Sequence, residues 1–147
     1  MAVTATLYDL FRKKLLTGAN PIVFGSDNIY VALVTDSYSP DRAADEFWDV
    51  PQAYEITGDE YVTDGALLAS KVIAVDGTGH YGVLTAADVT WAASTITAHY
   101  AVLYCKKSTA ATSPLIGYID FGTDESTVAT DFKLTFPNAA AGGVLKV

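Results

Sequence analysis

The motif nearest to a cofactor site is the segment GTGHYG at residues 77–82, whose glycine spacing matches a dinucleotide-binding fingerprint. That chemistry requires a helix that begins within the motif, so that its N-terminal N–H groups face the pyrophosphate. Here the segment runs into Tyr81–Leu84, which has the pattern of a short strand, and no strand–helix–strand unit follows. We therefore expect a glycine-rich hairpin and no bound cofactor.

Zinc and nucleophilic chemistry have few candidates, which are His80, His99 and the single cysteine, Cys105. A zinc site needs three or four closely spaced ligands, and these three residues are spread over the chain. No serine or cysteine motif suggests a nucleophile with a base and an orienting group. We expect His99 to pair with a polar group of a neighbouring strand and Cys105 to be a small core residue.

Carboxylates are the remaining candidates, because oxygen-rich loops bind calcium. Two groups of acids come close together along the chain: Asp41, Asp45, Glu46 and Asp49, and Asp59, Glu60 and Asp64. Neither group has EF-hand spacing, and an ordinary acidic loop is the commoner explanation, so no metal is predicted. No signal selects a carboxylate pair for glycoside cleavage either, and the protein is not expected to be an enzyme.

The length and composition of the chain indicate one domain over residues 1–147. Half of the residues are hydrophobic, and the formal net charge is −8. No apolar run approaches the ~18 residues of a membrane span, and no signal-peptide pattern is present, so we expect a soluble protein. Residues 36–64 hold nine acids and one base, Arg42, and therefore carry the whole charge imbalance. Such a segment repels a phosphate backbone, which argues against nucleic-acid binding.

One amphipathic helix is predicted at about residues 4–17, with an apolar stripe of Leu7, Leu10, Phe11 and Leu15 and with Gly18 at its end. The stripe covers the protein's own sheet or packs on a partner. A β core is predicted over about residues 28–136. Residues 137–147 are either a flexible tail or end in a last strand.

Within that core, residues 28–35 and 100–105 are apolar on both faces, which is typical of strands in the interior of a sheet. Residues 90–122 have the pattern of two strands joined by a polar turn. Apolar and polar residues alternate over residues 131–136, which predicts a strand with one face exposed to solvent. Many short strands separated by turn residues favour a mainly β fold, an antiparallel β-sandwich or barrel-like domain.

The acidic segment 36–64 is too long for an ordinary loop and contains aromatic residues, which argue against disorder. It is either a binding surface or a lid over the protein's own sheet. Together with the helix stripe, it supplies the residues that we expect to contact a partner: Leu7, Phe11, Tyr38, Phe47, Trp48 and Tyr54.

Several segments together resemble a family of small virion structural proteins from tailed bacteriophages. They are TLYDLFRKKLLTG at 6–18, IYVALVTDSYSPD at 29–41, VTWAASTITA at 89–98 and SPLIGYIDFG at 113–122. The likeness covers nearly the whole chain, and its motifs are structural rather than catalytic. The alanine- and glycine-rich end of this chain departs from the family pattern.

The resemblance implies a capsid decoration, or cement, protein that docks on an assembled head and braces it. The partners that it implies are the major capsid protein and further copies of the chain, often as trimers, without nucleic acid or membrane. The implied location is the head surface of the virion, with the host cytoplasm during assembly. Two alternatives remain open, a tail component such as a fibre or baseplate part, and a carbohydrate-binding or hydrolytic β-fold protein.

Overall fold

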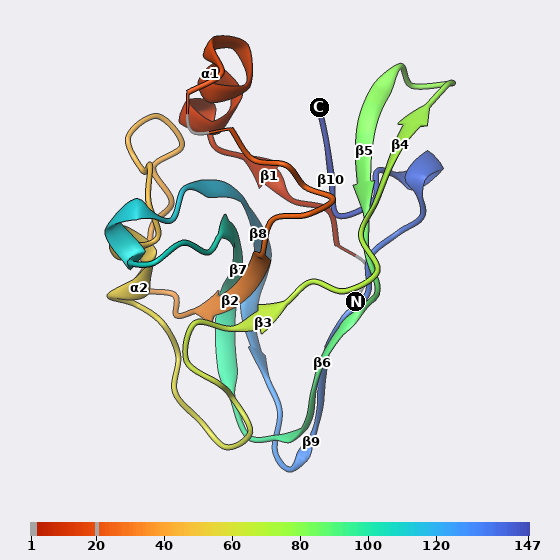
Figure 1. The fold of residues 1–147 in the computed structure, drawn as a ribbon. Coiled ribbons are helices and arrows are strands. Elements are labelled where there is room, and N and C mark those ends of the chain that lie inside the picture. The colour runs from red at the N-terminus through yellow and green to blue at the C-terminus, as the bar shows by residue number, and fades with distance from the viewer. Residues whose placement is uncertain (1–2, 20) are drawn as a thin grey trace.

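The computed structural model describes residues 3–19 and 21–147, and these residues form a mainly β structure with antiparallel sheets, as predicted (Figure 1). The strands are β1 (Thr6–Leu7), β2 (Ile29–Val34), β3 (Ala66–Leu67), β4 (Val72–Asp76), β5 (Tyr81–Thr85), β6 (Val89–Ser94), β7 (Thr97–Cys105), β8 (Leu115–Ser126), β9 (Thr130–Leu134) and β10 (Leu145–Lys146). The helices are α1 (Asp9–Thr17) and α2 (Asp49–Gln52), with 3-10 turns η1 (Ala110–Thr112) and η2 (Ala139–Ala141).

The main sheet has the strand order β1-β8-β7-β2-β3, so β2 and β7 lie in its interior, as their two apolar faces predicted. Their backbones pair from Ile29 opposite Cys105 to Val34 opposite Tyr100. Ile29 and Cys105 are both fully buried. The remaining strands form a three-stranded sheet, β10-β5-β4, and a two-stranded ribbon, β6-β9. A single hydrophobic cluster joins all three sheets.

The stretch 90–122 contains the two predicted strands, which are β7 and the first part of β8, and also most of β6, which agrees with a separate short strand predicted at residues 88–92. β6 pairs with β9, whereas β7 pairs with β8, so the chain changes its partner between Ser94 and Thr97. Ala93 has a φ of 50°, in the left-handed region, and this conformation interrupts the extended run. Ser94 stabilises the crossover, because its buried hydroxyl donates to the Thr130 carbonyl at 3.1 Å.

The N-terminal helix is shorter than predicted, because the residues before it form a strand. Thr6 and Leu7 pair with Tyr118 and Gly117 as β1, and α1 begins only at Asp9. The end of the helix agrees with the prediction, since Gly18 has a φ of 68° and its N–H donates to the Lys14 carbonyl.

The acidic segment 36–64 folds back over the main sheet, as in the lid interpretation. Trp48 stacks on Tyr104 of β7, with ring centroids 4.5 Å apart and an interplanar angle of 5°. Trp48 is 1% exposed and Tyr104 is fully buried, so the indole is part of the core. α2, which begins directly after Trp48, is the segment's only helix.

Asp64 fastens this segment to the sheet. Its carboxylate accepts hydrogen bonds from Trp48 Nε1 at 3.3 Å and Lys106 Nζ at 3.1 Å, and its carbonyl accepts one from Tyr104 Oη at 2.7 Å. Gln52 Nε2 donates to the same carboxylate at 3.2 Å. Burial alone would raise the pKa of Asp64, but the bonds from Lys106 and Trp48 outweigh it and hold that pKa below its usual value.

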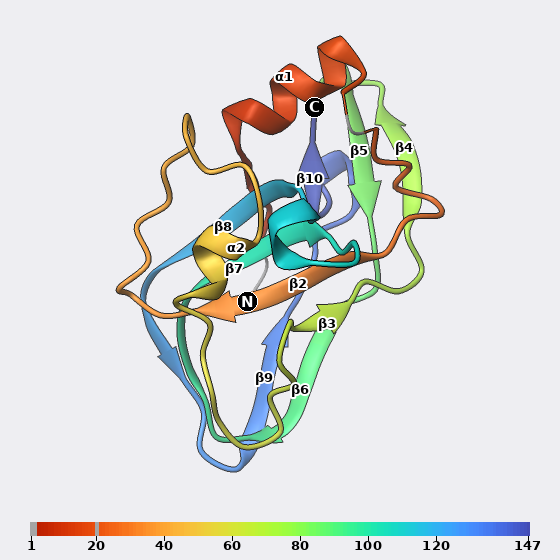
Figure 2. The same ribbon diagram turned by 60° about the vertical axis from the view of Figure 1, so that its left-hand side comes forward.

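The C-terminal segment packs and pairs, so it corresponds to the last-strand alternative rather than to a free tail. Val144 and Leu145 are buried, and β10 lies antiparallel to β5, with Leu145 opposite Leu84. Gly143 has a φ of 57°, and a Cβ at this position would collide with the Leu84 carbonyl. In Figures 1 and 2, β10 stands between α1 and the β4–β5 hairpin at one end of the molecule.

Candidate docking groove

The residues predicted to contact a partner do not form one exposed patch. Leu7, Phe11, Tyr38 and Trp48 are at most 2% exposed and belong to the core cluster. Of the other two, Tyr54 is 39% exposed, and Phe47 is half-buried beneath the Lys14 ammonium, which lies 4.5 Å from its ring centroid.

The polar candidates mostly have structural partners. His99 Nδ1 lies 2.8 Å from Asp124 Oδ1, on the neighbouring strand β8, which confirms the predicted pairing. Cys105 is fully buried, and this burial raises the pKa of its thiol. The segment 77–82 belongs to the β4–β5 hairpin, as predicted: residues 77–80 form its turn, and Tyr81 and Gly82 begin β5.

The carboxylates of the two predicted acidic groups do not converge on a common site. Asp45, which is 8% exposed, accepts a 2.7 Å bond from the Tyr38 hydroxyl and a 3.0 Å bond from the Asp41 N–H. Asp64 is held by Lys106, as described above. Over residues 3–19 and 21–147, no three His, Cys, Asp or Glu side chains come together in a group that could hold a metal ion.

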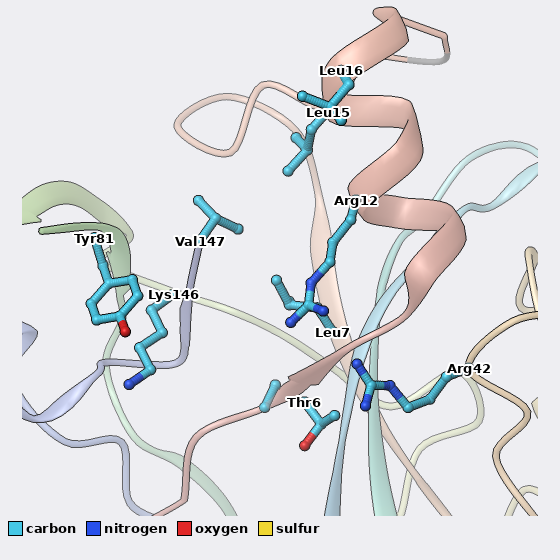
Figure 3. Close-up of a pocket in the computed structure, with 10 residues that line it drawn as sticks. Thr6, Leu7, Arg12, Leu15, Leu16, Arg42, Tyr81, Lys146 and Val147 are labelled. Carbon is cyan, nitrogen blue, oxygen red and sulfur yellow. The ribbon is translucent and has the colours of Figure 1, made fainter. Parts of the chain in front are cut away.

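The site that the structure does offer is a groove between α1 and the β10–β5 sheet (Figure 3). Its volume is about 670 Å³. It is lined by ten residues: Ala5, Thr6, Leu7, Arg12, Leu15, Leu16, Arg42, Tyr81, Lys146 and Val147. Four separate parts of the chain thus meet here, namely the N-terminal segment through α1, the start of the acidic segment, β5 and the C-terminal strand.

Apolar side chains on both walls of this groove are exposed. Leu15 is 46% exposed, Leu16 is 90% exposed, and Val147 on the opposite wall is 52% exposed. Phe11 is the one buried residue of α1 and packs edge-on against Phe24, which leaves Leu15 and Leu16 in the last turn exposed. Figure 3 shows Leu15 and Val147 projecting into the space between the two walls.

The groove is also cationic, although the chain as a whole carries −8. Figure 3 shows the guanidinium groups of Arg12 and Arg42 reaching into it from two different segments. Lys146 lines the opposite wall, with its ammonium 4.6 Å from the Tyr81 ring centroid. None of the ten lining side chains is acidic. The side chains of the lining are therefore positively charged, opposite in sign to the net charge of the chain.

The ion pairs leave this charge largely uncompensated. Arg42 pairs with Asp9 at 3.3 Å, and both side chains are about half exposed, so solvent screens the pair. In the described part of the chain, neither Arg12 nor Lys146 has an acidic side chain within 4.0 Å. An acidic group that entered the groove would meet two arginines suited to bidentate binding.

A second exposed apolar surface lies on β4, the edge strand of the same sheet on the far side of β5 from β10. Val75 lies opposite Gly82, and Gly82 exchanges backbone hydrogen bonds of 2.9 Å with Val147. Because Gly82 faces Val147, the N–H and C=O of Val75 point away from β5 toward solvent. On this strand Val72 is 56% exposed, Ile73 57% and Val75 77%. Exposed edges of this kind pair with other strands.

Sequence reasoning found only Leu7 and Leu15 of the groove, through the predicted helix stripe, because the other lining residues are far apart along the chain. One signal was present, however. Residues 72–75, VIAV, are apolar at every position, which fits neither a half-wet strand nor the surface of a small soluble domain. In the structure this run lies at an edge, where three of its four side chains are exposed.

Comparison with protein-family models, curated proteins and solved structures finds no match for this chain. In the described part of the chain, no helix has both the length and the apolar character that a membrane crossing needs.

Proposed function

We propose that this protein is a virion structural protein of a tailed bacteriophage, a decoration protein that docks on the assembled head and stabilises it. The proposal takes its biology from the resemblance of four segments to that family. The observation that carries it is the docking surface, which combines an apolar, cationic groove with the exposed apolar edge strand β4 of the adjoining sheet. Surfaces of this kind bind protein partners.

The physical basis of such stabilisation is mass action. A protein that binds only the assembled lattice stabilises it by its binding free energy. Many copies on one shell add these contributions, and a copy that bridges two subunits raises their effective concentration. Modest affinity at each groove is therefore sufficient for a large effect on the whole shell.

The carbohydrate-binding alternative has less support from the side chains. Glycan-binding proteins present exposed aromatic rings to the sugar, but both tryptophans of this chain are in the core. Trp48 is 1% exposed, and Trp91, which is 5% exposed, packs against Phe132. We therefore favour a protein-docking role over sugar binding. We also propose that the protein is not an enzyme.

Reconstitution on heads that lack the protein tests this function. Purified protein is added to such heads, and its positions are imaged while the heat resistance of the heads is measured. We expect regular binding on the head surface and greater heat resistance. Labelling confined to the tail would favour the tail alternative, and absence of binding to either part would contradict a virion role.

Two exposed valines offer a matched pair of variants for this assay. Val75, 77% exposed, lies on β4 in the proposed docking surface, and Val128, 79% exposed, lies in the β8–β9 turn at the opposite end of the molecule. We expect Val75→Lys to weaken head binding and Val128→Lys to leave it unchanged. Equal effects of the two changes would locate the contact elsewhere.

A further inference from the structure

The groove has a chemistry that selects its occupant. We propose that it binds an extended segment of another protein that combines carboxylates with apolar side chains. This inference rests on the proposed function, since the segment would belong to the head protein on which the chain docks. It goes further by specifying which surface binds and what the partner must present.

The carboxylate follows from the two arginines. Arg12 on α1 and Arg42 in the acidic segment after β2 bring like charges into one groove, and Asp9 is the single acidic side chain paired with either of them in the described residues. Like charges repel, so an anion between them is stabilised by both. The planar guanidinium fork fits a carboxylate with two parallel hydrogen bonds.

The apolar component follows from the walls. Leu15, Leu16 and Val147 expose about half or more of their surface in a space of about 670 Å³, which is large enough for several side chains. Burying such groups provides most of the free energy of docking, whereas the charges set orientation and choice of partner. A purely polar anion would leave these apolar side chains exposed to water.

The extended conformation follows from the backbone of β10. Residue 147 exchanges hydrogen bonds with Gly82 of β5, and Leu145 lies opposite Leu84. In antiparallel pairing the residue between two such positions turns its N–H and C=O to the other side. The backbone of Lys146 therefore faces away from β5, on the side where the groove lies, and a strand could pair with it there.

Nucleic acid, which also binds arginines, is the less suitable occupant. Residues 36–64 carry a net −8, and this segment contributes Arg42 itself to the groove rim. A long polyanion would have to pass these acids, whereas a short acidic segment would not. The leucines on the wall would also contribute little to binding a phosphate backbone.

Adjacent residues on α1 provide a test with a matched control. Arg12 lines the groove, whereas Lys13 is exposed, lies outside it and has no ion pair among the described residues. Arg12→Glu and Lys13→Glu change the net charge equally and are both at exposed positions, so the urea midpoints of both variants should match the wild type. Any difference in binding then reports the groove rather than overall charge.

The probes are three fluorescent ligands measured by anisotropy with the full chain. They are a short peptide that alternates valine or leucine with aspartate or glutamate, the same peptide with lysine in place of the acids, and an oligothymidylate. We expect the acidic peptide alone to bind. Arg12→Glu should weaken it about tenfold and Lys13→Glu by less than about twofold, because charges outside a groove are screened.

Several results would overturn the inference. They are absence of acidic-peptide binding, tighter binding of the lysine peptide or the oligothymidylate, and equal losses in the two variants. Self-association of the wild type that Arg12→Glu abolishes would assign the groove to a second copy of the chain instead.

Head binding, measured in parallel, separates this inference from the proposed function. If the protein binds heads but Arg12→Glu binds them as well as the wild type does, the groove assignment is wrong and the decoration role stands. If the acidic peptide binds in the groove but heads do not bind, the groove assignment stands and the decoration role is wrong.

Discussion

Removing the carboxylate of Asp64 should weaken the attachment of the acidic segment to the sheet. Asp64 has a φ of 73° and accepts hydrogen bonds from Trp48, Gln52 and Lys106. Asparagine tolerates this backbone conformation and keeps one acceptor, so Asp64→Asn removes mainly the charge. Lys106 and Asp64 are about one-third exposed, and we therefore expect a loss of only about 1 kcal/mol of unfolding free energy.

Asp64→Ala removes all of these acceptors. It also leaves at a positive φ an alanine, whose side chain cannot hydrogen-bond to the neighbouring backbone. The lost hydrogen bonds and the backbone cost together predict a loss of about 2–3 kcal/mol. Asp64→Gly removes the same acceptors but relaxes the backbone, so it should be less destabilising than Asp64→Ala. The unfolding free energy of each variant is measured by urea denaturation at pH 7, with tryptophan fluorescence reporting the Trp48 environment.

The pH dependence provides an independent check of the same reasoning. The pKa of Asp64 is lowered in the folded protein, so its stabilisation is present above the unfolded-state pKa of about 3.9 and is lost as the pH falls through the folded pKa. The difference in unfolding free energy between the wild type and Asp64→Asn should therefore become smaller from pH 7 to pH 3. A difference that is absent at pH 7, or that becomes larger in acid, would refute the account.

Three further changes test the packing of the fold and the exposure of the edge strand. Trp48→Ala removes a buried indole that stacks on Tyr104, and a loss of about 3–5 kcal/mol is expected in urea denaturation. Gly143→Ala places a Cβ against the Leu84 carbonyl at a positive φ, and thermal unfolding should show destabilisation of more than about 1 kcal/mol. Val75→Lys changes an exposed edge residue, so its urea midpoint should stay within about 0.5 kcal/mol of the wild type even though head binding falls. A strongly destabilised Val75→Lys would show that β4 is packed rather than free.

The parts of the fold that the sequence predicts are those set by local pattern. Residues 28–35 and 100–105 are apolar on both faces, and they form the interior strands β2 and β7. Gly18 ends α1 because only a residue that tolerates a positive φ suits that position. His99 pairs with a carboxylate of the adjacent strand, as its location in a strand suggested.

The parts that the sequence does not predict depend on contacts between distant residues. Thr6 and Leu7 continue the helical periodicity of α1, but pairing with β8 draws them into a strand. Trp48 is surrounded by acids in the sequence and looks exposed, yet stacking on Tyr104 and the bond to Asp64 bury it. Aromatic residues in an acidic loop are therefore weak indicators of a binding surface.

The groove illustrates the same limit. Arg12, Arg42 and Lys146 come together only after β1, β8, β5 and β10 have paired, and no spacing along the chain connects them. The positive charge of these three side chains is also opposite in sign to the net charge of the chain, which reflects the acidic segment and not the groove. Net charge therefore gives little information about a local docking surface.

A density map of intact virions tests the central claim most directly. We expect density for this chain at regular positions on the head, with the groove between α1 and β10 turned toward the shell and occupied by a segment of the head protein. Density that is confined to the tail, or copies on the head whose groove faces solvent, would contradict it.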